Sequence, residues 1–166
     1  GIAANNASGM CCGIAQNSYH TLDNIRVVLH DGSVLDTGDE ESIAAFKYTH
    51  ISLLENLKIL ALKTRSNEEL HQLIKHKYRL KNTTGYAINA LIDFEDPIDI
   101  LAHLMIGSEG TLGFISSITY NTVVEHKYRA SSLVFFPDIE TTCHAVSALA
   151  NANVSAVELM DRRALA

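Results

Sequence analysis

The stretch Gly107-Ser108-Glu109-Gly110-Thr111-Leu112-Gly113 decides the fold and carries the strongest functional signal. Its glycines stand at i, i+3 and i+6, a spacing of neither the dinucleotide turn GxGxxG nor a phosphate loop ending in Gly-Lys-Ser/Thr. Glycines let backbone N–H groups face a ligand, and the hydroxyls of Ser108 and Thr111 add donors. The concavity suits phosphate oxygens, although Glu109 would repel a bare phosphate and fits better on a hydroxyl or on backbone donors. Spacing alone leaves a ligand cradle and a tight helix-to-strand turn equally open.

The opening stretch is the second candidate site, with the sequence Ala3-Ala4-Asn5-Asn6-Ala7-Ser8-Gly9. Small residues allow close backbone approach to a ligand or to another element. The two asparagines can hydrogen-bond a polar heterocycle. Taken alone, a loop whose asparagines bond their own backbone is the favoured interpretation.

The elements around these stretches predict an α+β fold. Residues 24–30 are β-branched and apolar, and Asp31-Gly32 turns the chain into a second arm, so a hairpin is expected. Helical periodicity covers residues 41–63, and Asn67 followed by Glu68-Glu69 caps another helix that reaches about Tyr78. Residues 79–95 are mixed and polar, with a turn near Thr84-Gly85.

Two more elements flank the glycine-rich stretch, and a second unit follows them. Pro97 opens a short helix through His103, and residues 114–124 alternate as a strand. Beyond residue 125 the pattern predicts a strand at 131–136, a helix from Pro137-Asp138 to about Asn151 and a strand at 156–160, the start of a separate α+β module.

Composition narrows the function classes. The chain has 166 residues, 47% of them apolar and 19% charged, which suits a globular core. A net charge of −6 disfavours nucleic acid as a partner, and no apolar run reaches the roughly 20 residues of a transmembrane segment. Three cysteines without CxxC spacing predict a reducing, cytoplasmic compartment and no cysteine zinc site. The histidines lack metal-binding spacing, so no metal is expected.

Several motifs together resemble one family. The 107–113 stretch followed by Phe114-Ile115-Ser116 resembles the signature of FAD-linked oxidases of the vanillyl-alcohol-oxidase/p-cresol-methylhydroxylase (PCMH) type. The opening residues 1–9 resemble that family's second glycine-asparagine loop. Residues 9–13 and 81–86 look closest to bacterial D-lactate-dehydrogenase-like members, which oxidise D-2-hydroxyacids. Val157-Glu158-Leu159-Met160-Asp161 resembles the start of their cap domain.

The resemblance implies a division of the chain. Residues 1–125 would form the second subdomain of a PCMH-type FAD-binding domain, and residues 126–166 the start of an α+β substrate cap domain. Both ends read as interrupted, so we expect a fragment of a longer protein. The first subdomain, an iron–sulfur module and the catalytic residues are expected outside this chain.

The resemblance also assigns cofactor contacts. Residues of the opening stretch would line the flavin and diphosphate. Gly107, Ser108, Gly110 and Thr111 would approach the diphosphate and ribitol, and the backbone of residues 114–116 would lie near the adenine. Glu109 matches a family position close to the cofactor. The expected FAD-binding residues are Ala3, Ala4, Asn5, Asn6, Ser8, Gly9, Gly107, Ser108, Glu109, Gly110, Thr111, Gly113, Phe114, Ile115 and Ser116.

The expected substrate is a D-2-hydroxyacid, either D-lactate or D-2-hydroxyglutarate. The electron acceptor stays open between a quinone, a cytochrome and the iron–sulfur module. A cytoplasmic or peripheral membrane location is expected. Two alternatives remain: another flavin oxidase of the same superfamily, and a non-enzymatic α+β binding module whose glycine stretches are structural turns.

The chain by itself is predicted to show no turnover and weak or absent FAD binding, because half of the implied site is missing. Adding FAD to the purified chain and measuring retained yellow colour or a thermal shift checks this. Tight binding would contradict the requirement for the missing half.

Overall fold

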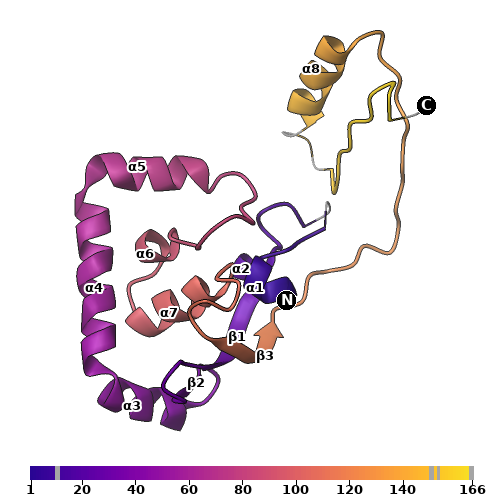
Figure 1. Ribbon diagram of the computed structural model, residues 1–166. Coiled ribbons are helices and arrows are strands. Elements are labelled where there is room, and N and C mark those ends of the chain that lie inside the picture. The colour runs from indigo at the N-terminus through magenta and orange to yellow at the C-terminus, as the bar shows by residue number, and fades with distance from the viewer. Residues whose placement is uncertain (10–11, 150–151, 153, 165–166) are drawn as a thin grey trace.

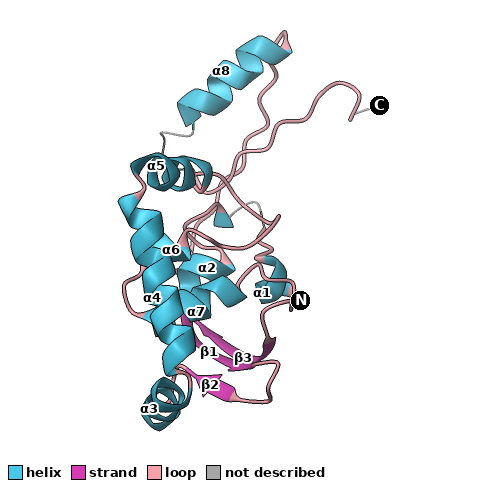
Figure 2. Ribbon diagram, turned by 60° about the vertical axis from the view of Figure 1, so that its left-hand side comes forward, coloured by secondary structure: helices cyan, strands magenta, loops and turns pink. Residues whose placement is uncertain are grey.

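The computed structural model describes residues 1–9, 12–149, 152 and 154–164 (Figure 1). Met10 and Cys11, part of one family-like string, lie outside the described residues. A three-stranded antiparallel sheet has the order β2-β1-β3, with β1 at Leu22–Val28, β2 at Val34–Asp36 and β3 at Phe114–Tyr120. Figures 1 and 2 show the larger helices on one side of this sheet. The mixed helix and sheet content is compatible with an α+β class.

The hairpin β1–β2 forms where the sequence predicts it. Val27 pairs with Leu35, and Gly32 turns the chain at φ 83°. The Asp31 carboxylate accepts hydrogen bonds from the Ser33 hydroxyl at 2.6 Å and the Ser33 N–H at 2.9 Å. These bonds hold the pKa of Asp31 well below its usual value. The turn is thus fixed by residues inside it.

The predicted helical region 41–63 forms two helices. α3 spans Glu40–Thr49 and α4 spans Ile51–Ser66, with His50 out of helical geometry between them at φ −119° and ψ 35°. The His50 ring stacks on Phe46 and its Nε2 lies 3.3 Å from Asp31 Oδ2. The helix is therefore interrupted at the residue that contacts Asp31 of the hairpin, and the hydrophobic periodicity of residues 41–63 gives no sign of this interruption.

The helices predicted to begin after Asn67 and at Pro97 begin at these residues in the structure. α5 spans Glu68–Lys77, and the Asn67 side chain accepts from the N–H of Leu70 at 3.0 Å. α7 spans Pro97–Met105, two residues longer than expected, and Asp96 caps it by accepting from the N–H of Ile98. Gly85 has a φ of 89°, as suits the predicted turn.

Three short helices were not predicted. They are α1 at Ile2–Asn5, α2 at Ser18–Thr21 and α6 at Ala90–Asp93. The first lies in the opening stretch expected to be a loop, so that expectation was wrong for Ala3 to Asn5. Helices of four residues carry too little periodicity to predict.

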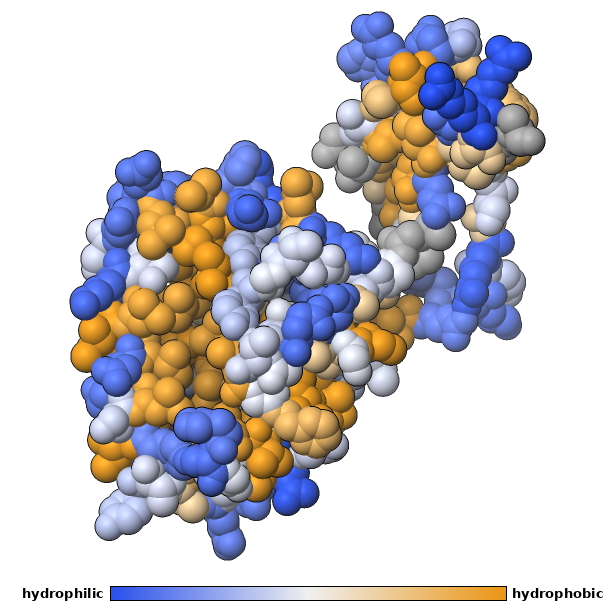
Figure 3. All heavy atoms as spheres, in the orientation of Figure 1, coloured by the Kyte–Doolittle hydropathy of each residue, from blue (hydrophilic) through white to orange (hydrophobic). Residues whose placement is uncertain are grey.

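The core lies between the sheet and the helices α4, α6 and α7. Ile25, Val27 and Leu35 contribute from the sheet, and Ile100 and Met105 from α7. Apolar side chains also gather on the surface over α4 and α5 (Figure 3). In the described part of the chain, no helix is long and apolar enough to cross a membrane.

The region after β3 departs from the predicted β-α-β order. β3 ends at Tyr120 instead of Val124, and the chain then runs extended to α8, Ile139–Leu149, which stands apart from the sheet (Figure 1). The predicted helix is present as far as Leu149, and residue 151 lies outside the described residues. The predicted strands at 131–136 and 156–160 were wrong. A helix satisfies its backbone locally, whereas a strand needs a neighbour to pair with.

Replacing Ile100 with Ala should lower the free energy of unfolding by about 2–5 kcal/mol, because this side chain is fully buried. The matched control Ile59→Ala, at a site 47% exposed on α4, should cost less than about 1 kcal/mol. Urea unfolding followed by circular dichroism measures both. Equal losses would contradict the assignment of the core.

Candidate functional site

The two candidate stretches lie side by side. The N–H of Gly107 donates to the carbonyl of Ala3 at 3.2 Å, and the N–H of Glu109 donates to the carbonyl of Ala4 at 2.9 Å. The glycine-rich stretch begins just after α7 and runs into β3, while α1 carries Ala3 and Ala4. Residues more than a hundred positions apart are thus joined through their backbones.

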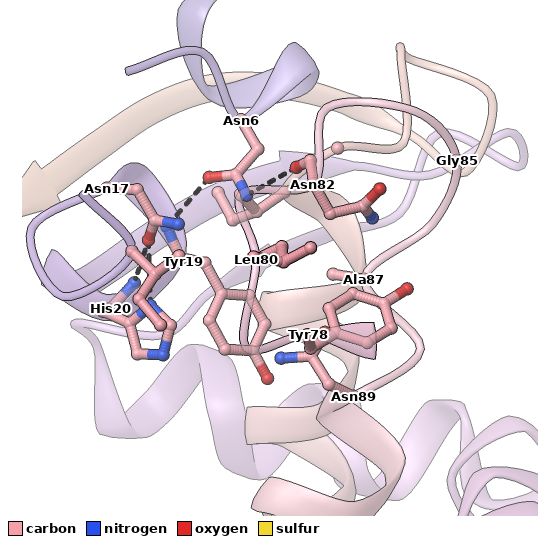
Figure 4. Close-up of a pocket in the computed structure, with 13 residues that line it drawn as sticks. Asn6, Asn17, Tyr19, His20, Tyr78, Leu80, Asn82, Gly85, Ala87 and Asn89 are labelled. Carbon is pink, nitrogen blue, oxygen red and sulfur yellow. Dashed lines mark hydrogen bonds between the residues drawn. The ribbon is translucent and has the colours of Figure 1, made fainter. Parts of the chain in front are cut away.

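The buried side chain of Asn6 links the backbone junction between residues 3–4 and 107–109 to two further segments of the chain. It is 7% exposed and adopts a left-handed conformation at φ 57°. Its Oδ1 accepts from the N–H of Tyr19 and its Nδ2 donates to the carbonyl of Asn82, both at 3.3 Å (Figure 4). The Tyr19 N–H lies in the first turn of α2, where a helix lacks internal acceptors. The Asn6 carboxamide is therefore committed to the protein interior.

The side chain of Asn5, in contrast to that of Asn6, makes its hydrogen bond at the surface. Its Nδ2 donates to Oε1 of Glu109 at 2.5 Å, and Glu109 is exposed with a φ of 53°. The Glu109 carboxylate, which would repel a bare phosphate, is thus hydrogen-bonded to the amide of Asn5. This contact adds a side-chain bridge to the two backbone bonds between the stretches.

The hydroxyls of the glycine-rich stretch are used by the turn itself. Ser108 is buried and its Oγ donates to the carbonyl of Met105 at 2.9 Å. Thr111 Oγ1 donates to the carbonyl of Ser108 at 2.6 Å, and the Tyr86 hydroxyl lies 2.8 Å from the same Oγ1. These hydroxyl protons are therefore not available to a ligand.

The open donors of this stretch are backbone N–H groups. Among the described residues, the N–H groups of Gly110 and Leu112 have no acceptor. Both residues are exposed. Gly110 has a φ of 78°, and a Cβ placed there would meet nothing within 4 Å. The surface at Gly110 can therefore admit an anion or a polar ligand.

The other expected contacts are spread more widely. A Cβ at Gly113 would lie 3.1 Å from the carbonyl of Val28, so this glycine permits close packing on β1. On β3, Phe114 is exposed, Ile115 is half-buried, and the Ser116 hydroxyl donates to the carbonyl of Arg26 at 3.0 Å. These three residues are positioned by the sheet, away from the contacts that join Ala3 and Ala4 to the glycine-rich stretch.

The end of the opening stretch carries one buried hydroxyl. Ser8 is half-buried, and its Oγ has no hydrogen-bond partner among the described residues. The backbone carbonyl of Ser8 accepts from Lys81 Nζ. Gly9 is exposed.

A pocket behind the junction was missed by the sequence reasoning. Asn6 and Gly107 line it together with Tyr19, Tyr78 and Asn89 (Figure 4). Burial, with a further contribution from Asp93, raises the pKa of Tyr19, and burial raises that of Tyr78. The segment 81–86, which resembles a family string, supplies Asn82 and Gly85 and was the one available signal.

The described residues show no group of side chains arranged to bind a metal ion. Within residues 1–9, 12–149, 152 and 154–164, no cluster of three or more His, Cys, Asp or Glu side chains could hold an ion. His103, near the pocket, stacks on Phe94 at 3.9 Å, and its burial lowers its pKa.

Comparison with known proteins links the chain distantly to the D-2-hydroxyacid dehydrogenases. The relative is a D-2-hydroxyglutarate dehydrogenase of Haemophilus influenzae, 26% identical over 163 residues. The match covers 90% of this chain but 15% of the relative, so the chain spans a small part of that protein's length. No family model and no solved structure matches the chain.

Asn6→Ala should lower the free energy of unfolding by about 1–3 kcal/mol, because it leaves the Tyr19 N–H and the Asn82 carbonyl without this partner. Asn5→Ala removes one exposed contact to Glu109 and should cost at most about 0.5 kcal/mol. Urea denaturation of both variants tests the distinction. A larger loss in Asn5→Ala would refute it.

Proposed function

We propose that this chain is part of an FAD-dependent oxidoreductase that oxidises a D-2-hydroxyacid. The observation that carries the proposal is the backbone junction between residues 3–4 and 107–109, which brings together the two stretches that resemble FAD-binding loops. The named relative supports the substrate class, and its name favours D-2-hydroxyglutarate over D-lactate.

The residues at the junction fit part of an FAD site. The open N–H groups of Gly110 and Leu112 suit diphosphate oxygens, because backbone donors bind anions where no side chain intervenes. Glu109, held by Asn5, suits a hydroxyl of the ribityl chain or the ribose. The free backbone donors of this stretch are few for a doubly charged diphosphate, which supports a second set of contacts outside this chain.

FAD would supply the redox chemistry, accepting the α-hydrogen of the hydroxyacid as hydride while a base takes the hydroxyl proton. This chain's own residues would bind and orient the cofactor. We assign the base, the substrate-binding cation and the electron acceptor to other parts of a longer protein.

The direct test is an assay of the full-length protein to which this segment belongs. It should be purified with flavin and reduce an artificial acceptor with D-2-hydroxyglutarate or D-lactate, and the L-enantiomers serve as controls. A full-length protein without flavin would favour the binding-module alternative. A flavoprotein inert toward both hydroxyacids would favour another flavin oxidase.

In that full-length protein, Gly110→Ala should weaken FAD binding by about tenfold or more. The methyl group would stand beside the N–H donors, and losing one hydrogen bond to a charged group costs about 1.5–3 kcal/mol. Fluorescence titration of the apoprotein with FAD measures the change.

Gly32→Ala is the matched control. Gly32 has a φ of 83° and open space around it, as Gly110 does, so both variants carry similar backbone strain of about 1–2 kcal/mol. The hairpin variant should keep its FAD affinity. Equal loss of affinity in both variants would show that strain, rather than contact, explains the effect.

A further inference from the structure

We propose that the pocket lined by Asn17 and His20 binds a small carboxylate anion. It is the pocket behind the backbone junction, and its lining also includes Asn6, Asn82 and Gly107. Figure 4 shows Asn17 and His20 together on one side of it. The proposal stands on the free polar groups of this lining and does not depend on FAD binding.

The first argument is a free donor on a buried side chain. Asn17 is 5% exposed, and its Oδ1 accepts from the backbone N–H of His20 at 3.0 Å, which fixes the orientation of the carboxamide. The amide nitrogen Nδ2 has no hydrogen-bond partner among the described residues. It also keeps accessible surface, because in the described part of the chain the fully enclosed side-chain atoms without a partner are Ser8 Oγ and Asn89 Oδ1. A ligand oxygen can therefore reach this donor.

The imidazole of His20 supplies a second donor and a charge. Its Nδ1 lies 3.0 Å from Oδ1 of Asn17, and an amide oxygen can only accept, so Nδ1 carries a proton. The other ring nitrogen, Nε2, has no partner in the part of the chain that the structure describes, and the residue is exposed. When the ring takes up a second proton, Nε2 becomes a donor and the ring carries a positive charge.

The charges beside the pocket favour an anion. Among the described residues that line it there is no Asp, Glu, Lys or Arg, so His20 is the lining group that can become positive near neutral pH. The exposed cations Arg79 and Lys81 are chain neighbours of the lining residues Leu80 and Asn82. Amide and imidazole donors with positive charge nearby suit a carboxylate better than an uncharged oxygen.

The surroundings limit the anion to a small one with a single charge. The Tyr19 hydroxyl and Asn89 Nδ2 both donate to Oδ2 of Asp93, a carboxylate just outside the lining, whose charge disfavours a second negative charge on the ligand. The free volume at the base of the pocket is about 20 Å³, within a wider hollow of about 350 Å³ that includes its opening. One carboxylate oxygen can enter the base while the rest of the ligand stays in the opening.

Nuclear magnetic resonance of the 166-residue chain tests the proposal with acetate as the probe and acetamide as its uncharged analogue of similar size. At about pH 6.5, an exposed imidazole is half protonated. Acetate should shift the Asn17 side-chain amide, the His20 ring signals and the Gly107 backbone amide until saturation, whereas sodium chloride at equal ionic strength should not. Acetamide should bind at least about tenfold more weakly, because it lacks the charge that strengthens both hydrogen bonds.

Two variants of equal charge locate the response. Asn17→Asp keeps an oxygen that accepts from the His20 N–H but replaces the Nδ2 donor with a negatively charged oxygen, so it should abolish the saturable shifts. Asn56→Asp makes the same charge change at an exposed position on α4 and should preserve them. His20→Gln, which removes the imidazole charge, should weaken acetate binding by about tenfold.

Shifts that stay linear in acetate, an equal response to acetamide, or acetate affinity retained in Asn17→Asp or His20→Gln would each overturn the proposal. Circular dichroism establishes that each variant is folded. If Asn17→Asp does not fold, the comparison of acetate with acetamide on the unaltered chain still decides.

Discussion

Two backbone hydrogen bonds, from Gly107 to Ala3 and from Glu109 to Ala4, hold the two ends of the described core together. They require the glycine-rich stretch to turn sharply after α7, with Gly107 at φ 83°. A Cβ at Gly107 would lie 3.4 Å from the carbonyl of Gly85, so a third segment also closes on this point. The positions of α1, of β3 and of the pocket lined by Asn6 and Gly107 all depend on that closure.

The polar groups around the closure divide into two sets. Asn6, Ser108 and Thr111 direct their hydrogen bonds into the protein and shape the turn. The N–H groups of Gly110 and Leu112, two exposed residues, have no acceptor in the described part of the chain. Stabilising contacts and potential ligand contacts therefore alternate within one short stretch. Composition alone, which shows only small and hydroxylated residues, cannot separate the two sets.

Local signals predicted a good part of the fold. Asp31-Gly32, Asn67 and Pro97 determine their turn and helix ends through atoms a few residues away, and the structure confirms these elements. The break at His50 and the interior role of Asn6 rest on contacts to distant segments, which a single sequence does not reveal. The predictions of strands at 131–136 and 156–160 were wrong. A strand-like sequence can indicate which side chains would share one face of a strand, but it does not show that a neighbouring strand is there to pair with.

The structure bears on where the two candidate stretches lie, and it does not test their cofactor contacts. The junction shows that residues 3–4 and 107–109 are neighbours, but the role of each residue toward FAD stays a prediction. The pocket lined by Tyr19, Tyr78 and Asn89 had no motif of its own, since these residues come from three separate segments. Tyr19 and Asn89 both donate hydrogen bonds to Oδ2 of Asp93, and no spacing rule encodes that contact between distant segments.

The two edge strands of the sheet, β2 and β3, differ in how readily each could pair with a further strand. β2 is three residues long and carries Asp36, and short charged borders resist further pairing. β3 has seven residues, FISSITY, without charge or proline, and in the described part of the chain it pairs with β1 alone. Phe114 is 69% exposed at its start. Any additional strand, from this polypeptide or a second copy, would therefore extend the sheet at β3.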